Sequence, residues 1–132
     1  MTERMTTQEI VKADCERYGF DYESFYRNLH GAIKSGKWRV LRHGNTLLLY
    51  ELTGPHMADM HIITADTIPK LALALREFDR GMRAAGFTHR TANIAGDSLL
   101  PVLRRAKIPF TATPAQEVVD GKVVTGYNLE FK

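Results

Sequence analysis

The stretch Asp59–Phe110 constrains the fold of this chain more than any other part of the sequence. Apolar residues predict strands over Met60–Thr64 and His89–Ile94, and the helical repeat predicts helices over Thr67–Ala85 and Ser98–Ala106. A strand–helix–strand–helix order usually places two roughly parallel strands side by side, with a ligand crevice at their carboxyl ends. The stretch therefore predicts a unit suited to a nucleotide-like ligand at a helix N-terminus.

Two helices are expected before this unit. Thr6 and Glu9 match a capping box, in which the side chain of each residue accepts the backbone N–H of the other. The helix that follows would stop at Gly19, which favours a left-handed end. Asp21 can cap a second helix. Residues 1–36 are therefore expected to form two N-terminal helices.

Four further strands are expected in two hairpins, because turn-forming residues separate two pairs of apolar runs. These are Trp38–Leu41 and Thr46–Leu52 around Arg42–Asn45, and Gln116–Val119 and Lys122–Phe131 around Asp120–Gly121. Residues 37–132 would then hold a mixed, mostly antiparallel sheet, two further helices and a C-terminal hairpin. A length of 132 residues fits one layered α/β domain, 1–132.

Composition excludes several classes of protein. Apolar residues make up 44% and charged residues 25%, which is typical of a globular domain. The formal charge of +3 permits an acidic partner without indicating one. Cys15 is the single cysteine, so an internal disulfide is excluded and a zinc–thiolate site is not expected. No apolar run reaches the ~20 residues of a membrane span, and the N-terminus lacks the apolar segment of a signal peptide.

The order of the expected elements resembles the fold of the GNAT acetyltransferase family without its first strand. Met60–Thr64 and His89–Ile94 would be the central strand pair of that fold. Asn93, the leucines after it and the ending Ala106–Phe110 resemble a family segment of asparagine, leucine-rich helix and Gly-Phe. In this chain Ile108–Pro109 stands where the family has glycine. The resemblance implies a GNAT-like α/β fold with a central βαβα unit.

Within that group, His61–Asp66 and the charged helix after it resemble GNAT-like proteins of short-tailed bacteriophages. Some of those proteins are counted as internal virion proteins. This resemblance implies a non-catalytic structural or accessory protein that acts through contacts with other protein subunits, virion components among them. It also implies a soluble protein, located in the host cytoplasm or associated with the virion.

The loop Thr64–Lys70 departs from the pyrophosphate-binding loop of active GNAT enzymes. It contains no glycine, Pro69 removes one N–H donor, and Asp66 places a carboxylate where a diphosphate would lie. We interpret Asp66 or Thr67 as the N-cap of the following helix. We therefore expect no cofactor, or acetyl-CoA if the chain is an enzyme. By position in the crevice, the resemblance implies four cofactor-binding residues: Thr64, Asp66, Thr67 and Asn93.

Catalytic groups can still be sought, because an acetyltransferase needs a base for the amine and an acid for the leaving thiolate. Glu51, Asp59 and His61 are candidates for the base. Strand alternation places His61 on the opposite face from Met60, where it is either a core residue or a base. Ser98 is the one hydroxyl of the final helix, which has no tyrosine, and it is interpreted as a cap. No catalytic residue is assigned, with Glu51, His61 and Ser98 as weak candidates.

Three functions remain open from the sequence. The first is the non-catalytic phage accessory protein, and the second is an active N-acyltransferase with an atypical cofactor loop. The third is a nucleic-acid-binding domain that uses arginines of the two C-terminal-half helices, although acidic residues interleave with them. Aromatic residues around the junction of the first two helices are a candidate protein–protein surface. His56 and His61 would face opposite sides of a strand, so no metal site is expected.

Overall fold

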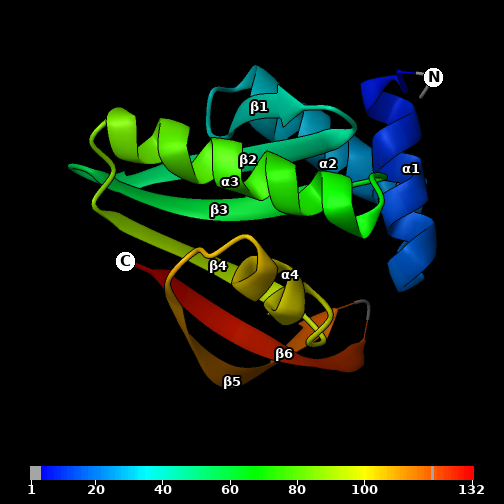
Figure 1. The fold of residues 1–132 in the computed structure, drawn as a ribbon. Helices are drawn as coiled ribbons and strands as arrows, with labels where there is room; N and C mark the ends of the chain where they lie inside the picture. Colours follow the sequence, from blue (N-terminus) through cyan, green and yellow to red (C-terminus); the bar gives the residue numbers. More distant parts are fainter. Residues whose placement is uncertain (1–3, 120) are drawn as a thin grey trace.

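We describe the fold from a computed structural model, in which residues 4–119 and 121–132 are described. The described residues form four helices and six strands in the predicted order (Figure 1). The elements are α1 (Thr7–Tyr18), α2 (Tyr22–Lys34), β1 (Arg39–His43), β2 (Thr46–Gly54), β3 (Met57–Thr64), α3 (Ile68–Ala84), β4 (His89–Ala95), α4 (Leu99–Arg105), β5 (Phe110–Val119) and β6 (Lys122–Phe131).

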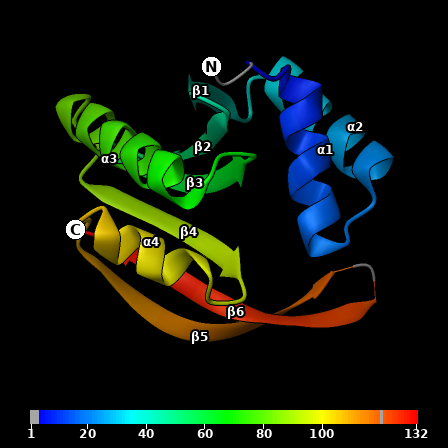
Figure 2. The same cartoon turned by 45° about the vertical axis from the view of Figure 1, so that its right-hand side comes forward.

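The six strands form one mixed sheet in the order β1-β2-β3-β4-β6-β5. The pair β3–β4 is parallel and the other neighbouring pairs are antiparallel, as predicted. Helices α3 and α4 cover one face and α1 and α2 the other (Figure 2). Each face has its own apolar cluster, because strand residues alternate between the two sides. No helix among the described residues is long and apolar enough to cross a membrane.

The first two helices begin where their capping residues predict. The Glu9 N–H donates to Thr6 Oγ1 at 3.1 Å, and the Thr6 N–H donates to Glu9 Oε1 at 3.0 Å. Gly19 ends α1 with φ 73°, a left-handed conformation that suits glycine. Asp21 caps α2 by accepting the Ser24 N–H at 3.3 Å. These predictions are confirmed because each depends on residues of one helical turn.

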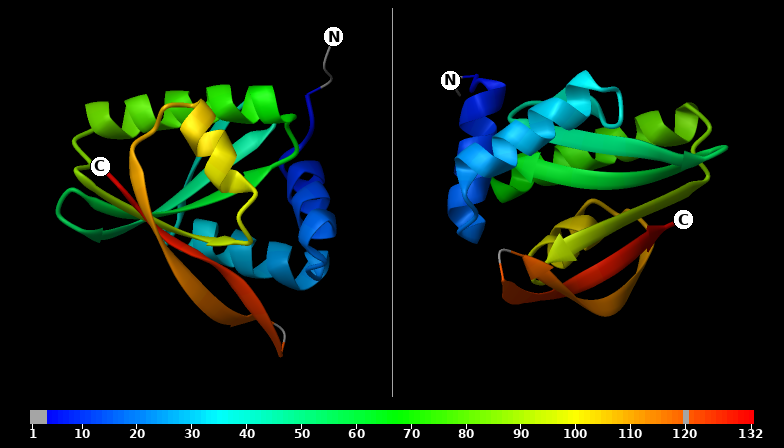
Figure 3. Two further views of the ribbon diagram at one scale, coloured as in Figure 1. Left: turned by 60° about the horizontal axis from the view of Figure 1, so that its bottom comes forward. Right: turned by 180° about the vertical axis from the view of Figure 1, so that it is seen from behind.

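Strand boundaries differ more from the sequence predictions. The first hairpin turns at Gly44 and Asn45, since β1 continues to His43. Strand β3 begins at Met57 rather than at Met60, and β5 begins at Phe110 rather than at Gln116. The reason is pairing with a neighbouring strand. Residues of β5 pair one by one with β6 from Phe110 onward, and the two form a long twisted hairpin (Figure 3).

Pro114 lies inside β5, although a proline within a sequence segment usually argues against a strand. The position is tolerated because β5 is an edge strand, so one side of its backbone needs no donor. The predicted turn Asp120–Gly121 falls partly on Asp120, which lies outside the described residues. At the other end, α1 is the first element among the described residues.

Candidate functional site

The parallel strands β3 and β4 separate toward their carboxyl ends. Their shared register runs from Met57–His89 to Met60–Ala92. Beyond that pair, β3 continues to Thr64 with β2 as its partner, and β4 continues to Ala95 with β6. Figure 1 shows the two strands moving apart there. The gap lies in the predicted position, at the carboxyl ends of the central strand pair.

A cavity of about 410 Å³, called the crevice below, occupies this gap between α1, α3, α4 and the sheet. The four residues predicted to bind a cofactor, and also Ser98, line the crevice. Its other lining residues are mostly apolar side chains of α3, α4 and the two strands. The fold therefore brings the four predicted residues together, while their role as cofactor ligands remains a prediction. They are Thr64, Asp66, Thr67 and Asn93.

In the turn before α3, Asp66 makes other hydrogen bonds than the sequence predicts. The Asp66 carboxylate accepts the Asn45 N–H at 3.0 Å and the Thr46 hydroxyl at 2.7 Å, so it bonds the β1–β2 turn. Thr67 occupies the N-cap position of α3, but its side chain makes no capping hydrogen bond. The prediction that Thr67 is the N-cap residue is confirmed in position, but neither Thr67 nor Asp66 provides a side-chain capping bond to α3. Asp66 fails to cap because a neighbouring turn offers its carboxylate two donors.

The glycine-free loop is compatible with the backbone it adopts. Among the described non-glycine residues, left-handed φ values occur at His56 and Lys107, both outside the loop. The loop from Thr64 to α3 therefore needs no glycine for its conformation. Pro69 lies in the first turn of α3, where its missing N–H breaks no helical hydrogen bond.

A second cavity of about 510 Å³, called the groove below, lies between α2 and the strands β3 to β6. Its polar lining includes the carboxylates of Asp21 and Glu117, and none of its lining residues is a lysine or an arginine. The groove is therefore acidic. The residues that line both cavities are Phe20, Phe25, His61, Asn93, Ile94 and Ala95.

His61 is the ionisable side chain shared by the two cavities. It faces α2, with its ring 6.4 Å from that of Phe25, whereas Met60 belongs to the opposite cluster. The predicted alternation is confirmed. Burial lowers the pKa of His61 below its usual value, although the carboxylates of Asp59 and Glu117 act in the opposite direction. The lowered pKa therefore favours the neutral imidazole at neutral pH.

The other candidates for a catalytic role do not line both cavities as His61 does. Glu51 pairs across the strands with Asp59 and lines neither cavity. Asp59 accepts the Thr91 hydroxyl at 3.0 Å. Ser98 lines the crevice at the N-cap position of α4, but its side chain makes no capping hydrogen bond. Its predicted position as a cap is confirmed, but it gives no side-chain bond, and its backbone already has helical φ and ψ.

Sequence reasoning missed a buried carboxyl group that lines the crevice. Asp14 is 7% exposed, and its Oδ1 accepts the Thr64 N–H at 3.2 Å. Burial raises the pKa of Asp14 to about 6, and the Thr64 N–H and the charge of Arg17 only partly offset it. The available signal was its spacing, since Asp14 lies four residues after Ile10 on the buried side of α1.

The aromatic residues at the junction of α1 and α2 line the two cavities. Tyr18, Phe20 and Phe25 line the crevice, the last two also line the groove, and Tyr18 is exposed. The Tyr18 and Phe20 rings stack with centroids 5.9 Å apart. These residues therefore form walls of the cavities. A role in contacts with protein partners remains a prediction.

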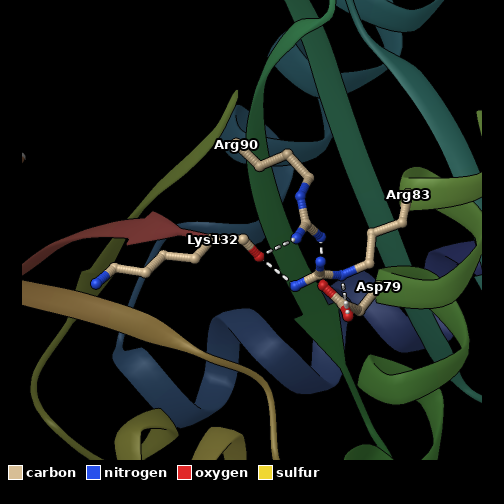
Figure 4. A network of polar contacts seen from close by, with 4 residues as sticks. All are labelled: Asp79, Arg83, Arg90 and Lys132. Atoms are coloured by element: carbon tan, nitrogen blue, oxygen red, sulfur yellow. Dashed lines mark hydrogen bonds and ion pairs between the residues drawn. The ribbon is translucent and has the colours of Figure 1, made fainter. Parts of the chain in front are cut away.

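A charged network around the buried Arg90 lies beside the inner end of the crevice (Figure 4). Arg90 is 2% exposed, pairs with Asp79 and donates to the Lys132 carbonyl oxygen at 3.2 Å. Arg83 also pairs with Asp79, at 2.9 Å, and donates to Lys132. Arg90 Nε has no acceptor among the described residues. Arg80, in turn, pairs with Glu77 at 3.4 Å, and nucleic-acid binding by this helix remains a prediction.

Comparison with known proteins gives the fold. No family model and no curated protein matches the chain. A ribosomal-protein-alanine N-acetyltransferase from Brucella melitensis is 14% identical, with a TM-score of 0.61 over 97% of this chain and 96% of that one. A Vibrio cholerae spermidine N-acetyltransferase chimera is 11% identical, with a TM-score of 0.61 over 98% and 90%.

A third similar structure was solved with CoA bound. It is a Bacillus subtilis acetyltransferase, 8% identical, with a TM-score of 0.58 over 97% of this chain and 93% of that one. Identities this low are informative about fold alone. The comparisons give no support to the resemblance to bacteriophage proteins. With its six-stranded sheet and four covering helices among the described residues, the chain has the mixed α/β fold of the GNAT acetyltransferases.

Proposed function

We propose that this protein is an acyl-CoA-dependent N-acyltransferase. Acyl-CoA binds in the crevice, an acceptor amine binds in the groove, and His61 is the general base. The observation that carries the proposal is the position of His61, which lines both cavities and whose lowered pKa favours the neutral imidazole. A base must reach the amine while that amine attacks the thioester, so it belongs where the two sites meet.

Two features support the crevice as the cofactor site. The separated ends of β3 and β4 leave room for an extended chain between them. The N-cap residue of α3, Thr67, lines the crevice without a side-chain capping bond, so the positive end of the helix faces the place proposed for a pyrophosphate. One neighbour of this fold was solved with CoA. The expectation that no cofactor binds therefore has no support.

The reaction needs one proton acceptor and one proton donor. The amine nitrogen forms a bond to the thioester carbonyl carbon, and His61 takes its proton. The carbon–sulfur bond then breaks, and the leaving thiolate takes a proton from the imidazolium or from water. The nearby carboxylates of Asp59 and Glu117 stabilise the imidazolium while it exists. The acidic groove also favours a cationic acceptor.

The non-catalytic role has less support than this reading. A purely structural role leaves the histidine shared by the two cavities without a function. The neighbours reported above are described as acetyltransferases. The loop still departs from the pyrophosphate loop of active enzymes, since Pro69 offers no N–H. We therefore expect weaker binding of the pyrophosphate than a glycine-rich loop would give.

Thermal-shift and calorimetric titrations with CoA and acetyl-CoA test the cofactor site. A ligand that binds only the folded state, at 100 times its dissociation constant, raises the free energy of unfolding by ~2.7 kcal/mol. We expect both compounds to stabilise the protein. If neither shifts the melting temperature at millimolar concentration, the proposal is wrong.

A matched pair of histidine variants tests the base. His61→Gln should lower the turnover of an amine panel by roughly 10²- to 10⁴-fold, with CoA affinity unchanged. His30→Gln is the control, because His30 is exposed on α2 and lines neither cavity. Thiol release is the measured signal. Full activity in His61→Gln would show that another group accepts the proton.

A further inference from the structure

The crevice continues past the point where its two strands separate. Ala92 is the last residue of β4 in register with β3, and Arg90, two residues before it, still lines the cavity. Two strand residues span roughly 7 Å. The cavity therefore extends on the α3 side of the sheet, beyond the space that the separated strand ends provide.

This inner part of the crevice is lined by apolar side chains of the hydrophobic core. Each of these side chains is less than a tenth exposed. They come from α3, from α4 and the loop after it, and from β6: Leu75, Phe78, Met82, Leu103, Ile108 and Phe131. A wall of apolar side chains favours an apolar group over a polar one, because a polar group would lose its hydration there without gaining a partner.

The charged network closes the far end. Arg90 and Asp79 line the crevice, and Arg83 and Lys132 hold them in place (Figure 4). The network is satisfied by its own ion pairs, with the exception of Arg90 Nε. An alkyl chain that reached this network would have to displace ion pairs, so the apolar space has a definite length.

We propose that the inner crevice is an acyl-chain site, so that the preferred donor carries an unbranched aliphatic acyl group longer than acetyl. The inference rests on the proposed function, because it needs the thioester to lie where β3 and β4 separate. From that point, an acetyl group is too short to reach the inner apolar side chains, whereas a butyryl or hexanoyl chain extends toward them. A donor with a charged acyl tip would lose its hydration in an apolar channel.

Calorimetric titration with CoA, acetyl-CoA, butyryl-CoA, hexanoyl-CoA and dodecanoyl-CoA tests the site. Each buried methylene should tighten binding roughly fourfold, so butyryl-CoA should bind at least tenfold more tightly than acetyl-CoA. Affinity should rise to hexanoyl-CoA and fall again for dodecanoyl-CoA. If CoA and acetyl-CoA bind but a longer chain gives no gain, the acyl-chain site is wrong and the proposed function stands. If none of the five binds, both are wrong.

Two leucines of α4 offer a matched pair of variants. Leu103 and Leu100 are both buried, but only Leu103 of the two lines the crevice. Leu103→Phe should remove most of the gain from acetyl-CoA to hexanoyl-CoA and leave CoA affinity unchanged, while Leu100→Phe should keep the gain. An unchanged chain-length preference in Leu103→Phe would overturn the inference. Should that variant fail to fold, Val102→Leu adds less volume to the same wall and must reduce the gain in the same direction.

Discussion

Asp14 on α1 joins the end of β3 through one hydrogen bond, in which its carboxylate Oδ1 accepts the backbone N–H of Thr64 at 3.2 Å. The two residues are 50 positions apart in the chain. The bond fixes α1 beside the crevice, and it places a carboxyl group of raised pKa among the lining residues. The contact therefore links the stability of the fold to pH.

Asp14 should make the protein less stable as pH rises from about 4 to about 6. Its pKa is raised from 3.8 to about 6 in the folded state, so the folded protein holds the proton more tightly than the unfolded chain. Stability is therefore lost as pH rises between these two values, by about 3 kcal/mol at most, and is constant above them.

Asp14→Asn removes this ionisation and keeps an oxygen that can accept the Thr64 N–H. The difference in unfolding free energy between the Asp14→Asn variant and the parent protein should change between pH 4 and 7, in favour of the variant at the higher pH. Urea denaturation at several pH values measures it, and the other carboxyl groups cancel in the difference. A pH-independent difference would contradict the raised pKa.

Asp66→Ala should destabilise the fold by about 1–3 kcal/mol. The substitution leaves the Asn45 N–H and the buried Thr46 hydroxyl without this acceptor. Asp97→Ala is the control, because Asp97 is an exposed residue of the turn before α4. Denaturation midpoints compare the two. Equal and small effects would mean that the Asp66 bonds contribute little.

Thr6→Ala should cost about 1 kcal/mol of stability, because it removes the acceptor for the Glu9 N–H at the start of α1. Thr7→Ala provides a matched control at the next position, where the side chain is exposed. Thermal denaturation distinguishes them. Comparable losses in both variants would show that the capping box is not the cause.

Gly126→Ala should destabilise the protein by about 3 kcal/mol or more, since a Cβ there would overlap the carbonyl oxygen of Ile94. The change would separate β4 from β6 beside the groove. Gly31→Ala is the matched control: nothing lies within 4 Å of its added Cβ in α2, and the helix should gain up to about 1 kcal/mol. In chemical denaturation, we expect the free energy of unfolding to fall in Gly126→Ala and to rise in Gly31→Ala.

Helix positions could be predicted because their signals are local. The Thr6–Glu9 box and the Asp21 cap act within one turn, and the buried stripe of α3 follows its own period. Where tertiary contacts compete, local signals were wrong. Asp66 bonds the β1–β2 turn instead of capping α3, and β5 starts at Phe110 because β6 provides a partner there.

The sequence alone determined the order of the elements, the capped helices and the face of β3 on which His61 lies, because these follow from spacing within single segments. Only the tertiary structure decided that β3 and β4 separate after Met60–Ala92, and that His61 lines both the crevice and the groove. The physical reason is that a cavity forms between elements. Its shape depends on how α2, α3 and α4 pack against the strands, which no single segment specifies.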